Sequence, residues 1–315
     1  MRAISIESFG GAEKLRTADL PRPKPVRGEV LIRTVSAGVN PMDWKICEGI
    51  YEGVLPHAFP LVPGWDVAGV VEELGEATAH LRKGDKVWAC ARKPTVQWGT
   101  YAEFVAVPED SVALMPAKLL FEEAASVPMA ALTAYQALFD VAHLEEGADV
   151  LIHAAAGGVG HFAVQLAKSA GARVFGTAGP AGHSFVMGLG ADGVIDYTRE
   201  DLGKGLGRLC PDGPDVVLDT MGGDAQEQSL ELLKPGGVLV STVEQPDSET
   251  VARRGLRAGL VSVKPSGDQL RILASMVEHE KLGTNVSKIY SLAEAAAAHE
   301  ESRAGHVHGK LVLAL

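Results

Sequence analysis

The stretch over residues 149–160 constrains the fold of this chain more than any other part of the sequence. An apolar run at 149–152 ends in small residues around Ala156, and a helical pattern follows over 159–170, ending at Gly171. Because no bulky side chain covers the turn, a pyrophosphate can approach the backbone N–H groups and the positive end of the helix.

The spacing at this turn, Ala154-x-x-Gly157-x-x-Gly160, departs from the usual Gly-x-Gly-x-x-Gly at its first position. A glycine pattern alone is a weak signal. Here, however, a second apolar strand over 173–177 follows at the distance that a βαβ unit requires. The stretch therefore predicts a dinucleotide-binding site rather than an ordinary strand turn.

Length and composition predict a two-domain globular protein. The 315 residues exceed the usual size of one core, and 46% hydrophobic with 22% charged residues is ordinary for packed domains. The net charge of −11 disfavours nucleic acid and anionic membranes as partners. No apolar run could span a bilayer, and residues 1–6 alternate as a strand does rather than forming a signal core. We therefore expect a cytoplasmic protein whose Cys47, Cys90 and Cys210 are reduced thiols.

The period of the apolar pattern changes near residue 121. Short strands separated by glycine and proline precede it, and alternating strands and helices follow it. We therefore predict the α/β class, with a β-rich domain over 1–122 and a doubly wound parallel sheet over 123–265. Residues 266–315 lie outside the six strands of that sheet. We expect them to return to the first domain and to leave the cofactor in a cleft between the domains.

The individual elements follow from the same patterns. The predicted strands cover 29–35, 66–75, 85–90, 99–107, 149–152, 173–177, 193–196, 215–219, 237–242, 260–263, 287–290 and 309–313. The predicted helices cover 121–125, 132–141, 159–170, 181–189, 225–233, 267–278 and 292–302.

Several motifs occur in the order found in one enzyme family. They are Ala37-Gly-Val-Asn-Pro-Met-Asp-Trp-Lys, Phe59-Pro-Leu-Val-Pro-Gly-Trp-Asp-Val-Ala-Gly-Val-Val, Lys83-Gly-Asp-Lys-Val, Gly99-Thr-Tyr-Ala-Glu, Ala131-Leu-Thr-Ala-Tyr-Gln-Ala-Leu and Leu189-Gly-Ala-Asp-Gly-Val-Ile-Asp-Tyr. Together with the turn of small residues that follows the strand at 149–152 and ends at Gly160, here called the phosphate loop, they make the chain resemble the medium-chain dehydrogenases/reductases. The resemblance is to the zinc-free quinone oxidoreductase branch in particular, which includes zeta-crystallin and the enone reductases. The resemblance implies a GroES-like catalytic domain, a Rossmann domain, and a homodimer formed through the Rossmann sheets.

The residue types at the positions of the zinc ligands predict no metal. A catalytic zinc ion requires three protein ligands of the Cys, His or carboxylate type around an open position. Zinc alcohol dehydrogenases have a cysteine where this sequence has Asn40, and Gly-His-Glu where it has Gly64-Trp65-Asp66. The four-cysteine structural loop of that branch is also missing. His306 and His308 share one side of a strand pattern, but no third ligand is evident, and a solvated turn explains them.

The end of the second Rossmann strand predicts the choice of cofactor. An acidic side chain there would bind the ribose 2′-OH of NAD and repel a 2′-phosphate, but the sequence is Gly176-Thr-Ala-Gly-Pro, so we expect NADP(H). In similar reductases a lysine and a tyrosine hold the 2′-phosphate. Tyr197 matches the tyrosine, whereas His183 stands at the lysine position, where a neutral imidazole would bind NADPH more weakly. A solvent-facing helix position for His183 and a core or edge position for Tyr197 are the alternatives.

The predicted cofactor-binding set combines the phosphate loop, the strand ends and the positions that touch the cofactor in the resembling enzymes. It comprises Thr133, Ala156, Gly157, Gly158, Val159, Gly160, Thr177, Ala178, His183, Tyr197, Ser241, Thr242 and Lys310.

Asn40, Lys45 and Tyr51 are the predicted catalytic residues. Hydride transfer leaves negative charge on the acceptor oxygen, which requires hydrogen-bond donors. The matching Asn-Pro-x-Asp-x-Lys segment of similar enone reductases borders the nicotinamide. Lys45 would donate to the substrate carbonyl or to the cofactor ribose, with the α-carbon proton coming from water, and Tyr51 and Trp65 would form pocket walls.

Each of these residues also has a purely structural interpretation. Asn40 before a proline is a good helix N-cap, and Asp43 is typical of a helix-start charge or a structural hydrogen-bond acceptor. Lys45 is also typical of a solvated side chain, and Tyr51 of a core aromatic.

Three functional hypotheses remain open from the sequence. The favoured one is an NADPH-dependent oxidoreductase that transfers a hydride to a small-molecule quinone or α,β-unsaturated carbonyl without zinc. The second is a zinc-independent alcohol or aldehyde dehydrogenase-like enzyme. The third is a non-catalytic NADPH-binding sensor or structural protein, because a fold alone does not give a function.

Overall fold

A parallel sheet of six strands is built around β10 (Asp149–Ile152), the strand that precedes the phosphate loop. Its order is β12-β11-β10-β13-β14-β15, and every neighbouring pair is parallel. The other strands are β11 (Arg173–Thr177), β12 (Gly193–Ile195), β13 (Val216–Asp219), β14 (Val238–Ser241) and β15 (Arg257–Leu260). The connections run outward in opposite directions from β10 and β13, which creates the switch point where such sheets bind ligands. The predicted doubly wound sheet is confirmed.

The structure is a computed structural model of residues 1–315, and its chain divides into two units. The first unit comprises Met1–Leu132, Lys264–Glu280 and Thr284–Leu315, and the second comprises Thr133–Val263 with Lys281–Gly283. The division that we expected at 122/123 falls inside α2 (Phe121–Ala125). This helix packs against β3 (Glu29–Val39), so closely that a side chain on Gly38 would overlap the carbonyl oxygen of Ala125. This packing explains why α2 lies in the first unit.

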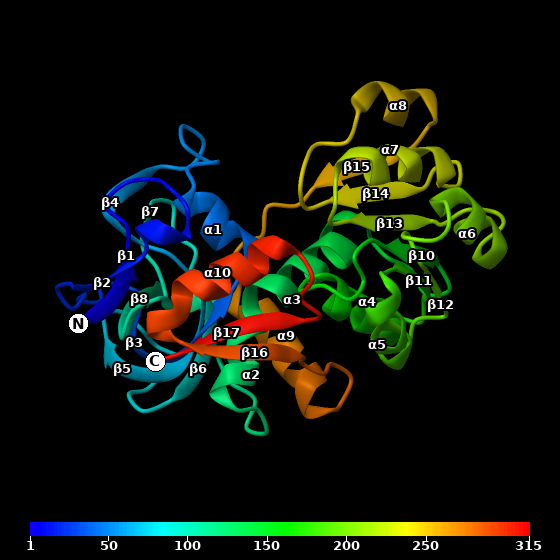
Figure 1. Ribbon diagram of the computed structural model, residues 1–315. Helices are drawn as coiled ribbons and strands as arrows, with labels where there is room; N and C mark the ends of the chain where they lie inside the picture. Colours follow the sequence, from blue (N-terminus) through cyan, green and yellow to red (C-terminus); the bar gives the residue numbers. More distant parts are fainter. The chain divides into compact units, whose positions relative to one another are not determined.

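Helices lie on either side of the parallel sheet (Figure 1). They are the π-helical segment η3 (Gln136–Val141), α4 (Gly160–Ser169), η4 (Pro180–Gly182), α5 (His183–Gly188), α6 (Leu202–Leu209), α7 (Gly223–Leu232) and α8 (Ser248–Arg253). Helix α3 (Pro128–Tyr135) begins in the first unit and ends in the second. In α4, Phe162, Leu166 and their apolar neighbours recur at helical spacing, and this buried face packs against β10 and β11.

Two of these helices, α6 and α8, are absent from the sequence prediction. Three glycines weaken the helical pattern of α6, but the carboxylate of Asp201 caps the helix by accepting the N–H of Lys204 at 3.1 Å. α8 lies in a stretch for which we predicted no helix or strand. The carboxylate of Asp247 caps it in the same way, at 2.7 Å from the N–H of Thr250.

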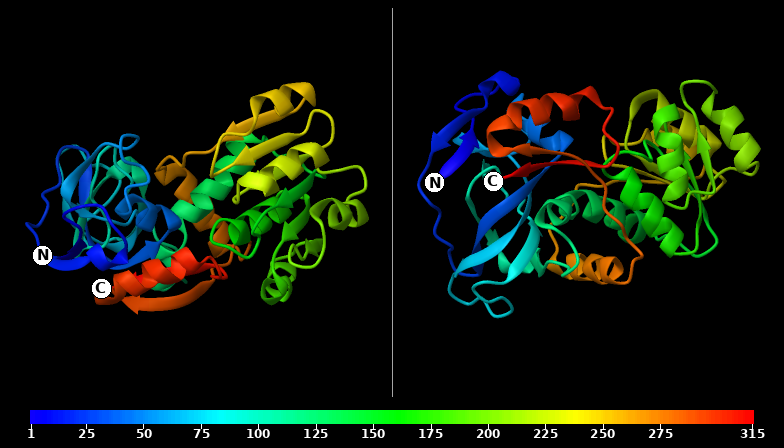
Figure 2. Two further views of the ribbon diagram at one scale, coloured as in Figure 1. Left: turned by 45° about the horizontal axis from the view of Figure 1, so that its top comes forward. Right: turned by 60° about the horizontal axis from the view of Figure 1, so that its bottom comes forward.

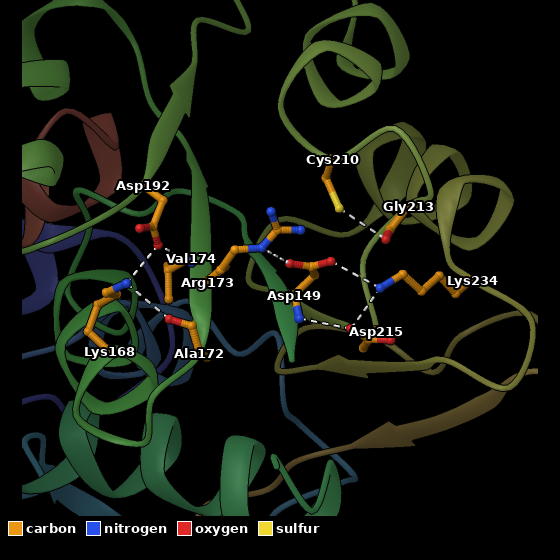
Figure 3. Close-up of polar contacts among 10 residues, drawn as sticks. All are labelled: Asp149, Lys168, Ala172, Arg173, Val174, Asp192, Cys210, Gly213, Asp215 and Lys234. Carbon is orange, nitrogen blue, oxygen red and sulfur yellow. Dashed lines mark hydrogen bonds and ion pairs between the residues drawn. The ribbon is translucent and has the colours of Figure 1, made fainter. Parts of the chain in front are cut away.

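A network of ion pairs holds the amino end of the parallel sheet (Figure 3). Asp149, the first residue of β10, accepts hydrogen bonds from Arg173 Nε at 2.6 Å and from Lys234 Nζ at 3.0 Å. Lys234 also donates to Asp215 at 2.9 Å. The hydrogen bond from Arg173 is the main reason why the pKa of Asp149 falls to about 2. These pairs tie together the starts of β10, β11 and β13, at the opposite end of β10 from the phosphate loop.

The first unit contains a seven-stranded sheet with β3 at its centre. β17 (Lys310–Ala314) and β5 (Asp66–Leu74) pair with β3 in antiparallel fashion, and β8 (Phe104–Pro108) pairs with its first half. β16 (Val286–Ser291) extends the sheet beyond β17, and β6 (Lys86–Cys90) and β9 (Val112–Leu114) extend it beyond β5. Figure 2 shows the red strand β17 beside the blue strand β3, so the last segments return to this unit.

Smaller elements complete the first unit. They are β1 (Arg2–Ser5), η1 (Ala12–Lys14), β2 (Arg16–Asp19), α1 (Pro41–Cys47), β4 (His57–Val62), β7 (Val96–Trp98), η2 (Glu109–Ser111), α9 (Gly267–Glu278), η5 (Leu292–Glu294) and α10 (Ala295–Ala304). Cys47, Cys90 and Cys210 are buried free thiols. No helix of the chain combines the length and the apolar character that a bilayer crossing requires.

Candidate functional site

The phosphate loop runs from the end of β10 into the first turn of α4. The N–H of Gly157 donates to the carbonyl of Ala154 at 2.8 Å, which closes the turn. The N–H groups of Gly158, Val159 and Gly160 donate to no acceptor in the chain. Such groups at the start of a helix need an external partner, and an anion satisfies them well.

Two positions of this loop have strict backbone requirements. A Cβ atom on Gly160 would lie 2.7 Å from the Cα atom of Ala155, so α4 can approach the loop only because this residue is glycine. Ala154 has a φ of 45°, a left-handed conformation that residues with a side chain rarely adopt. Its N–H donates to Oγ1 of Thr177 at 3.1 Å, which holds it in place. The loop therefore fits the pyrophosphate of a dinucleotide.

The end of β11 carries Thr177 and Ala178, which are both buried. Besides accepting the N–H of Ala154, Oγ1 of Thr177 lies 3.3 Å from Nδ1 of His153. Nε2 of His153 in turn lies 2.7 Å from the hydroxyl oxygen of Ser229. Thr177 thus holds the loop through its hydrogen bond with Ala154. The end of β11 carries no carboxylate.

His183 and Tyr197, the residues expected near a 2′-phosphate, both lie near the carboxyl ends of β11 and β12. The side chain of Tyr197 is 62% exposed, and its hydroxyl lies 3.5 Å from where a Cβ of Gly179 would be. His183 is half-buried at the start of α5, and its Nε2 atom is buried without a hydrogen-bond partner. Neither residue belongs to a core cluster.

The hydroxyl groups at the ends of β13 and β14 serve the fold. The Asp219 carboxylate accepts hydrogen bonds from Ser241 Oγ at 2.8 Å, Gln226 Nε2 at 2.9 Å and the N–H of Gly222 at 2.9 Å. The hydrogen bonds that it accepts from these groups lower the pKa of Asp219 despite its burial. Ser241 is fully buried, and the N–H of the neighbouring Thr242 donates to the carbonyl of Asp219. The hydroxyl proton of Ser241 is therefore already in use.

In the first unit, two predicted site residues meet in a buried cluster. The side-chain amide of Asn40, the N-cap of α1, donates to Asp66 Oδ2 at 2.8 Å and accepts a hydrogen bond from the ammonium of Lys310. Lys310 also donates to the carbonyl of Val39 at 2.9 Å, and Asp66 accepts the N–H of Met129 at 2.6 Å. Asn40, Asp66 and Lys310 are almost fully enclosed.

A second buried cluster adjoins the first. Oδ2 of Asp43 accepts the N–H of Asn40 at 2.8 Å and the hydroxyl of Tyr101 at 3.1 Å, and this hydroxyl lies 3.3 Å from Nε2 of His299. Desolvation raises the pKa of Asp43 to about 7 and lowers that of His299 to about 4. Asp43 acts here as a structural hydrogen-bond acceptor, one of the two interpretations that its position in the sequence suggests.

The remaining predicted residues are more accessible or apolar. Lys45 lies in the last turn of α1, half-buried, with its ammonium 5.6 Å from the ring centroid of Trp44 and no hydrogen-bond acceptor in the chain. Tyr51 is partly buried against the core of the first unit, and Trp65 is buried. Thr133 is buried in α3 at the start of the second unit.

The donor set does not fit a catalytic zinc ion. No three His, Cys, Asp or Glu side chains of the chain are grouped closely enough to hold one metal ion. Lys310 places a cation against Asn40 and Asp66, the residues at positions where the zinc branch has a cysteine and a glutamate. A metal ion would be repelled by this ammonium, and an amide oxygen is a poor substitute for a thiolate.

The sequence interpretation missed the partners that enclose these residues. The sequence predicts no role for Asp219, Tyr101 or His299, and it marks Asp66 only as the residue at the position of a zinc-branch ligand. The signal for Asp219 is its place directly after an apolar parallel strand, next to Thr220 and two glycines. Nothing local marks Tyr101 or His299, because their partners are far away in the sequence.

Comparison with known proteins agrees with this architecture. Residues 26–117 match the family model of the alcohol dehydrogenase GroES-like domain, and residues 189–313 match that of the zinc-binding dehydrogenases. The chain is 33% identical to the chloroplastic quinone-oxidoreductase homolog of Spinacia oleracea over 327 residues, which cover 99% of this chain and 98% of that protein.

Two solved structures extend the comparison to three dimensions. The quinone oxidoreductase from Coxiella burnetii superimposes with a TM-score of 0.90 at 36% identity, covering 100% of this chain and 99% of that one. The Escherichia coli quinone oxidoreductase complexed with NADPH gives a TM-score of 0.89 at 28% identity, with 100% of both chains covered. The predicted α/β class, with a GroES-like β-rich part and a Rossmann sheet, is confirmed.

Proposed function

Because this chain belongs to the quinone oxidoreductase branch of the medium-chain dehydrogenase/reductase superfamily, we propose that it reduces a small-molecule quinone or α,β-unsaturated carbonyl with NADPH and without zinc. The observation that carries the proposal is the phosphate loop. Three successive N–H groups without an acceptor line a turn in which Gly160 leaves no room for a side chain. A pyrophosphate satisfies those groups, and the Escherichia coli relative is complexed with NADPH.

The preference for NADP(H) is supported by the end of β11. Thr177-Ala178-Gly179 offers no carboxylate that would bind a ribose 2′-OH or repel a 2′-phosphate. Tyr197 and His183 lie near that strand end, and both keep polar atoms that the chain does not use. We assign these two side chains, with the loop 156–160, to the cofactor.

We assign the stabilisation of the developing oxyanion to Lys45. The bound nicotinamide would supply the hydride, which in an enone goes to the β-carbon and leaves an enolate. The Lys45 ammonium has no acceptor in the chain and can donate to that oxygen, and water returns the α-carbon proton. Asn40 and Lys310 already bond to each other, so we assign them the positioning of α1 rather than direct contact. Tyr51 would form an apolar wall.

The proposal includes a homodimer and a cytoplasmic location. β15 is one of the two edge strands of the parallel sheet and exposes Leu260, so a second copy can extend the sheet through this edge. Three buried free thiols are typical of a reducing compartment. Light scattering is expected to give twice the chain mass, and Leu260→Lys is expected to lower it to that of the monomer.

A panel of quinones and enones assayed with NADPH and NADH in parallel tests the function. We expect steady oxidation of NADPH by at least one class of acceptor in protein from which elemental analysis recovers no zinc. Tight NADPH binding with no turnover across the panel would favour the non-catalytic alternative. Stoichiometric zinc would contradict the zinc-free mechanism.

Lys45→Ala tests the assignment of the donor. Loss of one donor to an oxyanion is expected to lower kcat by roughly 10- to 100-fold while the Kd of NADPH changes little. Lys83→Ala is the matched control, because Lys83 is exposed and its only ion pair is with Glu72 at 3.7 Å. Equal kcat in the Lys45 variant and in the wild type would remove Lys45 from the mechanism.

A further inference from the structure

One guanidinium near the carboxyl end of β12 has unused hydrogen-bond donors. The side chain of Arg199 is 76% exposed, and its Nε atom lies 3.3 Å from Oδ2 of Asp196. This is the only partner of the side chain, so both Nη groups of Arg199 are free to bind a ligand. An arginine held through Nε presents its other nitrogens as a planar fork, which suits the bidentate binding of phosphate.

Asp196 serves to hold this arginine rather than to repel an anion. Its Oδ1 atom accepts hydrogen bonds from the N–H of Thr198 at 3.0 Å and from the Thr198 hydroxyl at 2.6 Å, and Oδ2 faces Arg199. These bonds, with the positive charge of Arg199, lower the pKa of Asp196. The carboxylate is buried and its charge is matched by its neighbours. The Asp196 carboxylate therefore does not prevent an anion from binding at the surface next to Arg199.

Arg199 belongs to the same neighbourhood as the residues that face the ribose end of a dinucleotide. Tyr197 is two positions away, and its hydroxyl lies close to Gly179, which follows β11. His183 is near enough to Asp196 to influence its pKa. In a doubly wound sheet the adenine ribose lies at the end of the second strand, here β11, and an arginine nearby accommodates the 2′-phosphate.

We propose that Arg199, positioned by Asp196, binds the 2′-phosphate of NADP(H) and selects this cofactor over NAD(H). Arg199 supplies a permanent positive charge near His183, which stands at the position where similar reductases have a lysine. This inference rests on the proposed function, because it assumes that the phosphate loop binds a nicotinamide dinucleotide.

Binding measurements with the whole protein test the inference without any turnover. Isothermal titration of wild type and Arg199→Ala uses four probes: NADPH and 2′,5′-ADP, which carry the 2′-phosphate, and NADH and 5′-AMP, which lack it. We expect Arg199→Ala to weaken the two phosphate-bearing probes by about tenfold and to leave the other two within about twofold. Arg199→Glu is expected to weaken NADPH further and to reverse the preference.

Arg208→Ala is the matched control. Arg208 is a similarly exposed arginine on α6, paired with Glu200 at 2.9 Å, and its loss is expected to leave all four affinities unchanged. If wild type prefers NADPH and Arg199→Ala keeps that preference, or weakens all four probes alike, the role of Arg199 is overturned while the proposed function stands. Equal affinity of wild type for NADPH and NADH also overturns it. If neither dinucleotide binds to wild type, the proposed function itself fails, and this inference fails with it.

Discussion

The Lys310 ammonium lies 3.8 Å from a carboxylate oxygen of Asp66, and the two side chains are only 4% and 0% exposed. Lys310 begins β17 and Asp66 begins β5, so the pair bridges the two strands on either side of β3. Desolvation lowers the pKa of Lys310 and raises that of Asp66, because burial disfavours both charged forms. Charge is therefore costly here unless both partners are present.

Lys310→Met is expected to lower the free energy of unfolding by about 3–5 kcal/mol, because it leaves the Asp66 carboxylate buried without its cation. The double variant Lys310→Met/Asp66→Asn removes that charge and should recover part of the loss. Lys288→Met, on the neighbouring strand β16, is the control, since Lys288 pairs with Glu301 at the surface and should cost at most about 1 kcal/mol. Urea unfolding measures all three. If Lys310→Met and Lys288→Met lower the free energy of unfolding equally, the burial of the Lys310–Asp66 pair does not contribute to stability.

The Asp43 carboxyl predicts a dependence of stability on pH. Its pKa rises from 3.8 to about 7 on folding, so between these values the folded state holds a proton that the unfolded state releases. Its contribution to stability is complete below pH 3.8 and is lost as the pH rises through about 7. From about pH 5 to about pH 7 the loss is on the order of 2–3 kcal/mol.

Asp43→Asn keeps an oxygen for Asn40 and Tyr101 but cannot ionise. Its unfolding free energy should therefore depend on pH less steeply than that of wild type when urea titrations at about pH 5 and about pH 8 are compared. Asp212→Asn, in an exposed loop, should retain the wild-type slope. The same slope in Asp43→Asn as in wild type would mean that Asp43 is not the group responsible.

Gly160→Ala is expected to weaken the binding of nicotinamide dinucleotides by at least about tenfold and to destabilise the fold by about 1–3 kcal/mol. The added Cβ atom would lie 2.7 Å from the backbone of Ala155, which cannot move without opening the loop. Gly157→Ala is the graded control, because its nearest neighbour, the carbonyl oxygen of Ala154, would lie 3.2 Å away. Calorimetric titration and thermal unfolding compare the two. Unchanged binding and melting in Gly160→Ala would refute the tight approach of α4.

Two glycines of α6 should respond in opposite directions to the same substitution. A Cβ on Gly207 meets nothing within 4 Å, so Gly207→Ala should stabilise the helix by about 0.5–1 kcal/mol. A Cβ on Gly205 would lie 2.7 Å from Cγ2 of Ile195, so Gly205→Ala should be destabilising. Urea unfolding provides the comparison, and a gain in both variants would argue against the packing of α6 on β12.

The parts of the fold that local pattern controls could be predicted from the sequence. β10, the loop and α4 follow from an apolar run, small residues and helical spacing within 149–170, and the structure has them there. Helix α6 was not predicted because its three glycines lower the helix propensity of the segment. The capping side chain of Asp201 offsets this loss only in the folded chain.

Contacts between distant parts of the chain explain what the sequence could not reveal. Asn40 before Pro41 could be read as a helix cap or as a site residue, but its amide bonds to Asp66 and Lys310, which lie 26 and 270 positions away. A lysine at the start of a terminal strand is ordinarily expected in solvent or on a ligand, whereas Lys310 is enclosed. Burial of a charged group depends on tertiary packing and leaves no local signal.

The central place of β3 has a consequence for how the protein is made. β3 and its partner β17 are separated in the sequence by the whole of the second unit, whose main segment, Thr133–Val263, is continuous. During synthesis the second unit can therefore fold on the ribosome as soon as its main segment has emerged. The first unit, although its synthesis starts earlier, cannot complete its sheet until β17 is made and pairs with β3. We therefore expect the Rossmann unit to fold before the unit that contains both ends of the chain, and a chain that stops near residue 309 should hold a folded Rossmann unit and a first unit that lacks β17.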